Sequence, residues 1–161
     1  MIDTGTLMPG RKKPLLLFGV AVFLALADRC LKSLALIVGE RGEGVLRFSL
    51  FMNPGIAFSI PLAEIIFWPL AVAALVALGW LIRRAWINRT AALPWLVMIA
   101  LGALSNAYDR VVYGATIDYL MFFNRSVVNI ADGMIVVGVL MVLLQEKSGK
   151  VGDMKVEVDA H

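Results

Sequence analysis

Four long apolar stretches, separated by short polar segments, set the pattern of this chain. They cover residues 15–38, 65–82, 91–108 and 127–144. A helix needs about 20 residues to cross the hydrocarbon core of a bilayer, so each stretch is close to the length of one crossing. The pattern therefore predicts an all-α membrane protein with four transmembrane helices.

The polar interval at residues 39–61 differs in character from the helices on either side. It contains several residues that break helices, namely Gly39, Gly42, Gly44, Pro54, Gly55 and Pro61. Within it, residues 45–52 suit short strands. We expect a small β-rich element outside the membrane between the first two helices. Residues 1–145 then form one four-helix domain, and residues 146–161 form a flexible, charged tail.

Composition agrees with a membrane location. Hydrophobic residues make up 60% of the chain, compared with roughly 45 to 50% in soluble domains. The net charge of +3 is small, and its distribution does not predict a nucleic-acid partner. We expect a monomer surrounded by membrane lipids.

The positions of the basic residues predict how the chain is oriented. Nine of them fall on one side of the four-helix topology: Arg11, Lys12, Lys13, Arg83, Arg84, Arg89, Lys147, Lys150 and Lys155. Loops rich in Lys and Arg stay in the cytoplasm. Both termini, including the charged tail, are therefore expected in the cytoplasm, and the intramembrane aspartates toward the outer face.

A single cysteine, Cys30, and a single histidine, His161, limit the chemistry that this chain can perform. A zinc site needs several His, Cys or carboxylate ligands, and a Ser–His or Cys–His pair needs a histidine within the fold. We therefore expect no metal and no cofactor. Aspartate is the residue type that remains for acid–base catalysis.

Charged residues near or within the apolar stretches are candidates for function, because inserting an Asp, Lys or Arg at the bilayer centre costs about 2.5 to 3.5 kcal/mol. Asp28 and Lys32 lie four residues apart on one helical face, so we expect them to pair and to support the fold. Asn106 lies three and four residues before Asp109 and Arg110. We expect Asp109 to form a salt-bridged scaffold with Arg110, and a role as a catalytic base stays open for it.

Asp118 follows the third apolar stretch, and Asp132 lies near the start of the fourth, three residues after Asn129. The connection between them can bring the two carboxyl groups together. Two close carboxylates in a partly dry site cannot both ionise, so the pair would hold one proton and supply both an acid and a base for peptide hydrolysis. Alternatively, Asp132 only caps the helix, since Asp is favourable in a first turn. The residues alone leave both roles open.

Two further functional classes fit the same residues. One is a small four-helix transporter in which Asp118 and Asp132 bind protons or cations and Lys32 acts as a gate. The other is a structural subunit whose polar residues hold helices together.

Four motifs, in order along residues 28–138, resemble those of the lipoprotein signal peptidases (signal peptidase II). Asp28 and Lys32 resemble the family's Asp-x-x-x-Lys, and residues 53–58, NPGIAF, resemble its Asn-x-Gly-x-Ala-Phe. Residues 106–110, NAYDR, followed by Gly114 and by residues 117–119, IDY, are similar to its Asn-x-x-Asp-Arg, Gly and Val-Asp-Phe. Residues 129–132, NIAD, match its Asn-x-Ala-Asp. Neither the transporter nor the subunit gives the NPGIAF segment a purpose.

This resemblance implies an intramembrane aspartyl peptidase with Asp118 and Asp132 as the catalytic pair. The supporting or substrate-positioning residues that it implies are Asn53, Gly55, Asn106, Asp109, Arg110, Asn129, Asp28 and Lys32. The implied substrate is a prolipoprotein whose cysteine carries diacylglycerol, cut just before that cysteine to release the signal-peptide helix. The implied location is the bacterial cytoplasmic (inner) membrane. Residues 39–61 would form a cradle on its outer surface, and the aromatic segment 119–123 would line the path of the substrate.

The chain also departs from the family pattern. The family's glycines ahead of Asn106 appear here as Leu101, Gly102 and Ser105, which implies different close packing at two positions. Val128 replaces the phenylalanine that usually precedes Asn129, and the connection from Asp118 to Asp132 is short, which implies a small flap over the site.

Overall fold

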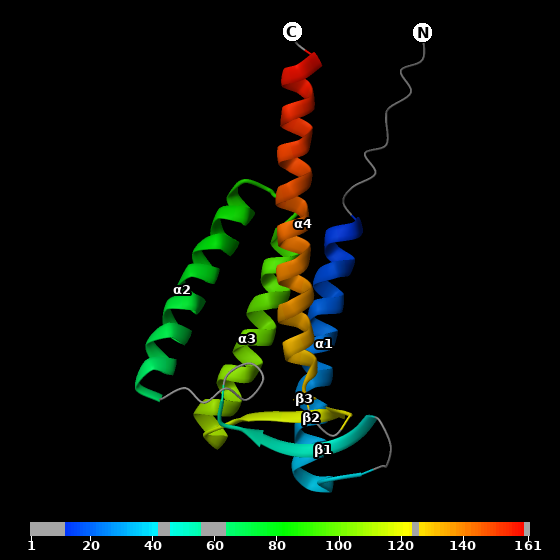
Figure 1. Ribbon diagram of the computed structural model, residues 1–161, viewed down its shortest axis with the longest axis vertical. Coiled ribbons are helices and arrows are strands. Elements are labelled where there is room, and N and C mark those ends of the chain that lie inside the picture. The colour runs from blue at the N-terminus through cyan, green and yellow to red at the C-terminus, as the bar shows by residue number, and fades with distance from the viewer. Residues whose placement is uncertain (1–11, 42–45, 56–63, 124–125, 160–161) are drawn as a thin grey trace.

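A computed structural model describes residues 12–41, 46–55, 64–123 and 126–159, and within them four helices stand over a small sheet (Figure 1). The helices are α1 (Lys12–Val38), α2 (Glu64–Ile87), α3 (Leu93–Tyr113) and α4 (Ile130–Asp159). The strands are β1 (Leu46–Asn53), β2 (Thr116–Phe122) and β3 (Ser126–Val128).

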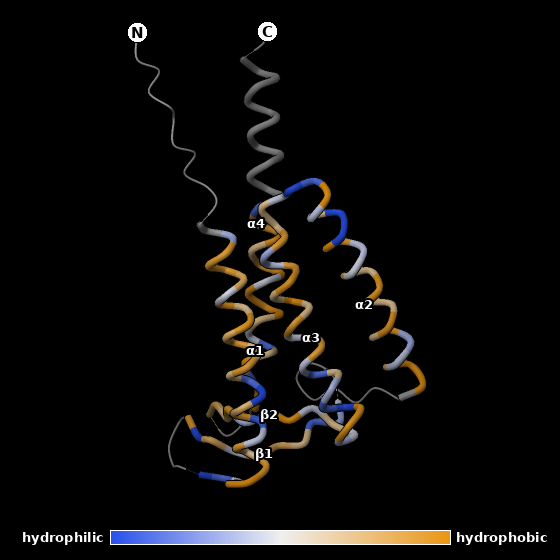
Figure 2. The backbone as a smooth tube through the Cα atoms, turned by 180° about the vertical axis from the view of Figure 1, so that it is seen from behind, coloured by the Kyte–Doolittle hydropathy of each residue, from blue (hydrophilic) through white to orange (hydrophobic). Residues whose placement is uncertain are grey.

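Three of the helices form the body of the molecule. α1, α3 and α4 run side by side, whereas α2 packs mainly against α3 and leans away from the others (Figure 1). α1 begins and α4 ends at the end opposite the sheet. The hydrophilic parts of α1 and α3 lie where these helices approach the sheet, as the hydropathy colouring shows (Figure 2).

Several charged and polar side chains lie inside this protein, whereas many large apolar side chains lie on its surface. The largest fully buried side chains include Asp28, Lys32, Asp109, Asp118 and Asn129. Large apolar side chains on the helices are instead exposed, such as Phe23 at 69% and Ile65 at 83%. A soluble monomer rarely exposes a large contiguous apolar surface. The distribution fits helices that are surrounded by lipid.

Two of the described helices are long and apolar enough to cross a membrane, over Pro14–Val38 and Ile65–Ile87. The apolar part of α4, Ile130–Gln145, is shorter, and α3 carries charged residues in its last turns. The structure therefore supports two spans directly. The count of four remains a prediction.

The structure is mostly helical with a small β-rich element, as expected, but this element draws on two parts of the chain rather than one. β1 comes from the expected interval, but it pairs with β2, and β2 pairs with β3, in an antiparallel sheet of order β1-β2-β3. β2 and β3 lie between α3 and α4. Their Val, Ile, Thr, Tyr and Phe residues favour strands. Residues 42–45 and 56–61 of the expected element lie outside the described residues.

Local structure accounts for several of the helix ends. Gly39 and Gly114 adopt left-handed conformations, with φ of 69° and 73°, and end α1 and α3. α4 begins at Ile130 rather than at residue 127, because residues 126–128 form β3. At its other end the helix continues to Asp159, so residues 146–159 of the expected flexible tail are helical.

Glycines bring α3 and α4 into close contact. A Cβ on Gly102 would lie 2.6 Å from the backbone oxygen of Ala131, and one on Gly138 would lie 2.5 Å from Ile99 Cγ1. Small residues allow helix backbones to approach closely in membranes. The contact at Gly102 fixes the first turn of α4, which carries Asp132.

Candidate active site

A buried cluster of charges joins α1 to α3. Lys32 Nζ lies 2.9 Å from Asp28 Oδ2 and 2.7 Å from Asp109 Oδ2, and all three side chains are fully buried. Arg29 Nη1 lies 2.5 Å from Asp109 Oδ1. Ser105 donates its hydroxyl to Asp28 Oδ2 at 2.6 Å. The expected pairing of Asp28 with Lys32 is confirmed, and Asp109 joins it.

The expected pairing of Asp109 with Arg110 is wrong. Consecutive residues on a helix point in different directions, about 100° apart. Asp109 faces α1, whereas Arg110 donates to Thr116 Oγ1 at 3.0 Å and to the backbone oxygens of Pro54 and Gly55. Its guanidinium also lies 4.2 Å from the ring centroid of Phe67 on α2. Arg110 therefore ties the end of β1 to α3 and α2.

Asp28 also anchors the start of α4. Its Oδ1 accepts the hydroxyl of Tyr119 at 3.0 Å and the backbone N–H of Ala131 at 3.2 Å, while the N–H of Ile130 donates to the Tyr119 oxygen at 3.1 Å. Burial raises the pKa of Tyr119 above its usual range, so this hydroxyl stays protonated. One carboxylate thus connects α1, α3, β2 and α4.

Asp118 lies in the middle of β2 and is buried. Its two carboxyl oxygens accept one amide donor each. Asn53 Nδ2 donates to Oδ2 at 2.9 Å, and Asn129 Nδ2 donates to Oδ1 at 2.6 Å. The Asn53 oxygen in turn accepts the backbone N–H of Gly55 at 3.0 Å. β1 and the segment before α4 therefore hold this carboxyl group from both sides.

Asp132, the third residue of α4, forms a reciprocal cap with Asn129. The backbone N–H of Asp132 donates to Asn129 Oδ1 at 2.8 Å, and the N–H of Asn129 donates to Asp132 Oδ2 at 3.3 Å. This is a capping box with Asp at the third position. The capping role considered for Asp132 is thus present. In addition, Asn106 Nδ2 donates to Asp132 Oδ1 at 2.8 Å.

Two amides connect the aspartates to each other. Asn129 contacts Asp118 through its nitrogen and Asp132 through its oxygen, and it also donates to Asn106 Oδ1 at 3.2 Å. The fold therefore brings together Asp118, Asp132, Asn53, Asn106 and Asn129, which lie in four separate segments of the sequence. Such a site can hold a proton on one carboxyl group beside an ionised partner.

The electrostatics at Asp118 are those of an acid that can hold a proton near neutral pH. Burial raises the pKa of Asp118 from 3.8 to about 6. Hydrogen bonds from Asn53 and Asn129 act against this rise. The charge of Asp132 adds to it, and the charge of Lys32 opposes it. A raised pKa is typical of carboxyl groups in catalytic sites.

The amino-acid sequence of this chain is similar to those of a known peptidase family. A profile of the family described as signal peptidase (SPase) II matches residues 20–146. The chain belongs to the signal peptidase II family. Lipoprotein signal peptidases of Streptomyces coelicolor and Streptomyces griseus are 32% and 34% identical, and the alignments cover 84% and 86% of this chain and 72% and 76% of theirs. The lipoprotein signal peptidase of Dichelobacter nodosus is 36% identical, over 84% of this chain and 95% of its own.

The fold is also that of a solved protein. A structure described as a bacterial membrane enzyme superposes with a TM-score of 0.67 at 23% identity, covering 86% of this chain and 91% of that one. Family membership and the apolar helices together identify an integral membrane peptidase of bacterial type. The transporter and structural-subunit alternatives are not favoured, because the relatives are peptidases.

Three residues of this signal peptidase II site have contacts that were not predicted from the sequence. Arg29 and Ser105 complete the charged cluster, and Tyr119 links Asp28 to α4. Tyr119 is fully buried, so the expectation that it lines a substrate path is wrong for this residue, while Phe123 is 70% exposed. Polarity within an apolar helix is the signal that could have found Ser105.

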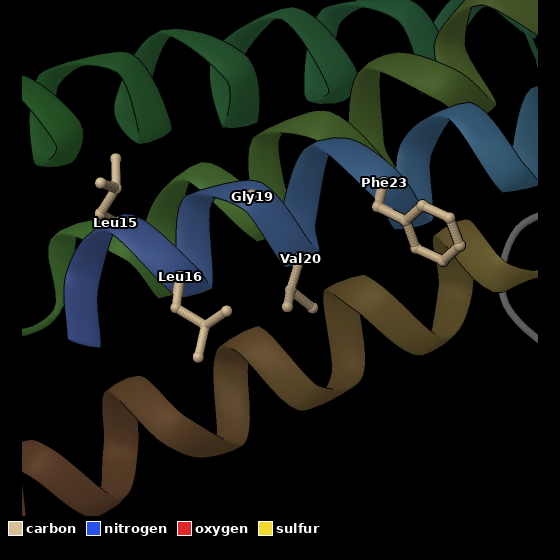
Figure 3. A pocket seen from close by; sticks show the side chains of 5 residues that line it. All are labelled: Leu15, Leu16, Gly19, Val20 and Phe23. Atoms are coloured by element: carbon tan, nitrogen blue, oxygen red, sulfur yellow. The ribbon is translucent and has the colours of Figure 1, made fainter. Parts of the chain in front are cut away.

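A hollow on the surface lies away from these residues. Leu15, Leu16, Gly19, Val20 and Phe23 on α1 line a volume of about 560 Å³ (Figure 3). These groups cannot act on a peptide bond, and their character matches the acyl chains of a bilayer. Within the described ranges, no group of three or more His, Cys, Asp or Glu side chains is arranged to hold a metal ion.

Proposed function

We propose that this member of the signal peptidase II family is an aspartyl endopeptidase. It cleaves a diacylglyceryl-modified prolipoprotein just before the lipidated cysteine and releases the signal-peptide helix. Asp118 and Asp132 are its catalytic residues. The observation that carries this assignment is that two amides, Asn129 and Asn106, link these carboxyl groups in a site reached from α3, α4 and both β1 and β2.

The pair works with a single shared proton. The ionised carboxylate takes a proton from water as the water oxygen bonds to the carbonyl carbon, and the protonated partner gives its proton to the carbonyl oxygen. In the second step, the first aspartate protonates the departing nitrogen while the C–N bond breaks. The second aspartate recovers a proton from a hydroxyl group as the carbonyl re-forms. Both carboxyl groups then return to their starting states.

The amides around the pair hold the carboxyl groups in position. Asn53 and Asn129 donate to Asp118, and Asn106 donates to Asp132. Each donor fixes one oxygen and so restricts rotation of the carboxyl group. Fixed geometry is worth a large part of an enzymatic rate, since a 1 Å displacement can cost about 100-fold.

Arg110 and Gly55 are suited to position the substrate near Asp118. Arg110 binds the backbone oxygens of Pro54 and Gly55, so it sets the path of the chain that follows Asn53. Residues 56–58 of the NPGIAF motif lie outside the described residues. Asp28, Lys32 and Asp109 support the site from behind as a buried scaffold.

The site lies at the end of the molecule that carries the sheet, opposite the start of α1 and the end of α4 (Figure 1). With basic segments retained in the cytoplasm, this end faces outward from the bacterial inner membrane. The protein works there as a monomer that crosses the membrane four times and uses neither metal nor cofactor.

Carboxylate-to-amide variants test the catalytic pair. Asp118→Asn and Asp132→Asn should each lower cleavage of a diacylglyceryl-modified prolipoprotein in detergent micelles by at least about 100-fold, because each removes one proton-transfer group. Glu40→Gln, the same change at an exposed residue, should cleave normally. Normal cleavage by both pair variants, with the control also active, would refute the assignment.

A further inference from the structure

Lys32 contacts a residue of the aspartyl site in addition to its two ion-pair partners in the buried scaffold. Its ammonium has three N–H donors. Two of them are taken by Asp28 and Asp109, at 2.9 and 2.7 Å. The third donates to Asn106 Oδ1 at 2.8 Å, and Ser105 Oγ lies farther from the same nitrogen, at 3.3 Å. The other end of the same amide, Asn106 Nδ2, donates to Asp132 Oδ1 at 2.8 Å.

Three amides face the aspartyl pair, and each is oriented by a donor on its oxygen. The backbone N–H of Gly55 orients Asn53, and the backbone N–H of Asp132 orients Asn129. The Asn106 oxygen is oriented by a charged side chain, Lys32, and also accepts a hydrogen bond from Asn129 Nδ2 at 3.2 Å. An ammonium group can only donate, so the Asn106 oxygen must face it and the NH₂ group must face Asp132.

The charge of Lys32 is also placed to act on the pair. The charged and titratable groups around the aspartyl pair are Asp28, Arg29 and Lys32 from α1, Asp109 and Arg110 from α3, and Tyr119 from β2. Strand β1 contributes the neutral Asn53. Asp28 and Asp109 carry two negative charges, and Lys32 and Arg29 carry two positive charges. Loss of Lys32 alone would leave a negative charge beside two carboxyl groups that share a proton.

We propose that Lys32 is a positioning residue of the aspartyl pair: held by Asp28 and Asp109, it orients the Asn106 amide toward Asp132 and sets the pH range in which the pair carries one proton. This inference rests on the proposed function. It differs from a purely structural role, which would change the stability of the protein but not its pH dependence.

The pH dependence of kcat/KM separates these two roles. In Lys32→Met, both limbs of the profile should move to higher pH by roughly one unit, the lower end of the effect of a nearby charge on a carboxyl group. Lys32→Arg keeps the charge and should keep the limbs in place. Ser105→Ala removes a hydroxyl that contacts both Asp28 and Lys32, but it leaves the charge of Lys32 and its contact with Asn106 in place. It should lower thermal stability without moving the limbs.

A double-mutant cycle tests whether Lys32 acts through Asn106. Lys32→Met and Asn106→Ala should each lower kcat by up to about 100-fold, and the double variant should lose little more than either. Full multiplication of the two effects would overturn the positioning role. Limbs of Lys32→Met that coincide with those of the unmodified protein would overturn the electrostatic role.

Folding must be checked, because Lys32→Met leaves buried carboxylates without their cation. If this variant does not fold, Lys32→Met/Asp109→Asn restores the charge balance, and its limbs should lie at higher pH than those of Asp109→Asn alone; limbs that coincide with those of Asp109→Asn would overturn the charge argument. Active Asp118→Asn and Asp132→Asn variants would refute the proposed function itself. In contrast, inactive pair variants together with unshifted limbs in Lys32→Met would overturn only the electrostatic role of Lys32.

Discussion

Replacement of Asp28 by asparagine should destabilise the protein far more than its small chemical change suggests. Asp28 is fully buried and accepts four donors, from Lys32, Ser105, Tyr119 and Ala131. Asparagine has the same shape but only one oxygen. In either orientation, its NH₂ group would face a group that can only donate: the Lys32 ammonium or the Ala131 backbone N–H.

The magnitude follows from these contacts. Removing one partner of a buried ion pair costs about 3 to 5 kcal/mol. Because Asp109 still holds Lys32, we expect a loss near the lower end, about 3 kcal/mol. For a chain of this size each kcal/mol corresponds to roughly 2 to 4 °C. The melting temperature of Asp28→Asn should therefore fall by roughly 6 to 12 °C.

Thermal unfolding in detergent, followed by tryptophan fluorescence, measures this change. The matched control is Glu40→Gln, since Glu40 is 57% exposed and pairs with Arg47 at 3.4 Å. Exposed pairs contribute at most about 1 kcal/mol, so the control should melt within roughly 4 °C of the unmodified protein. Equal shifts in the two variants would refute the reasoning that Asp28 is a buried junction.

Three further predictions concern packing, protonation and metals. Gly102→Val should push α4 away from α3 and lower both stability and cleavage. Gly79→Val is the control, because its Cβ would meet no atom within 4 Å, and it should lower stability and cleavage much less. Equal effects of the two substitutions would contradict the role of the close contact. Because the pKa of Asp118 is raised to about 6, the pair loses its proton above that pH, and kcat/KM should fall tenfold per pH unit on the alkaline side of pH 6. A profile that stays flat to pH 8 would count against Asp118 as the titrating acid. Prolonged dialysis against a zinc chelator should leave cleavage unchanged, and inhibition reversed by added zinc would contradict a metal-free mechanism.

Local spacing predicted the contacts that depend on one helix. Asp28 and Lys32 lie four residues apart, and the geometry of the helix alone brings them together. The same reasoning failed for Asp109 and Arg110, because adjacent positions in a helix diverge. The actual ion-pair partners of Asp109 are Arg29 and Lys32, which lie 80 and 77 positions earlier in the chain. Spacing within α3 carries no information on which helix will face it.

The sheet was harder to predict for a similar reason. Residues 45–52 have the composition of a strand, but their hydrogen-bond partner is β2, which follows α3. A register such as Phe51 opposite Asp118 depends on how the helices fold back, and on a bulge between Phe48 and Phe51. Residues 127 and 128 looked like the start of a helix because they continue an apolar run. Their pairing with β2 instead makes them strand.

If Asp132 exchanges protons as proposed, its role as a helix cap ties the first turn of α4 to the reaction cycle. Asp132 accepts the N–H of Asn129 best as a carboxylate, and each turnover would place a proton on it. Its hold on the helix start would then weaken and recover once per peptide bond cut. The start of α4 would thus be held least firmly while the intermediate exists and firmly again when the products leave.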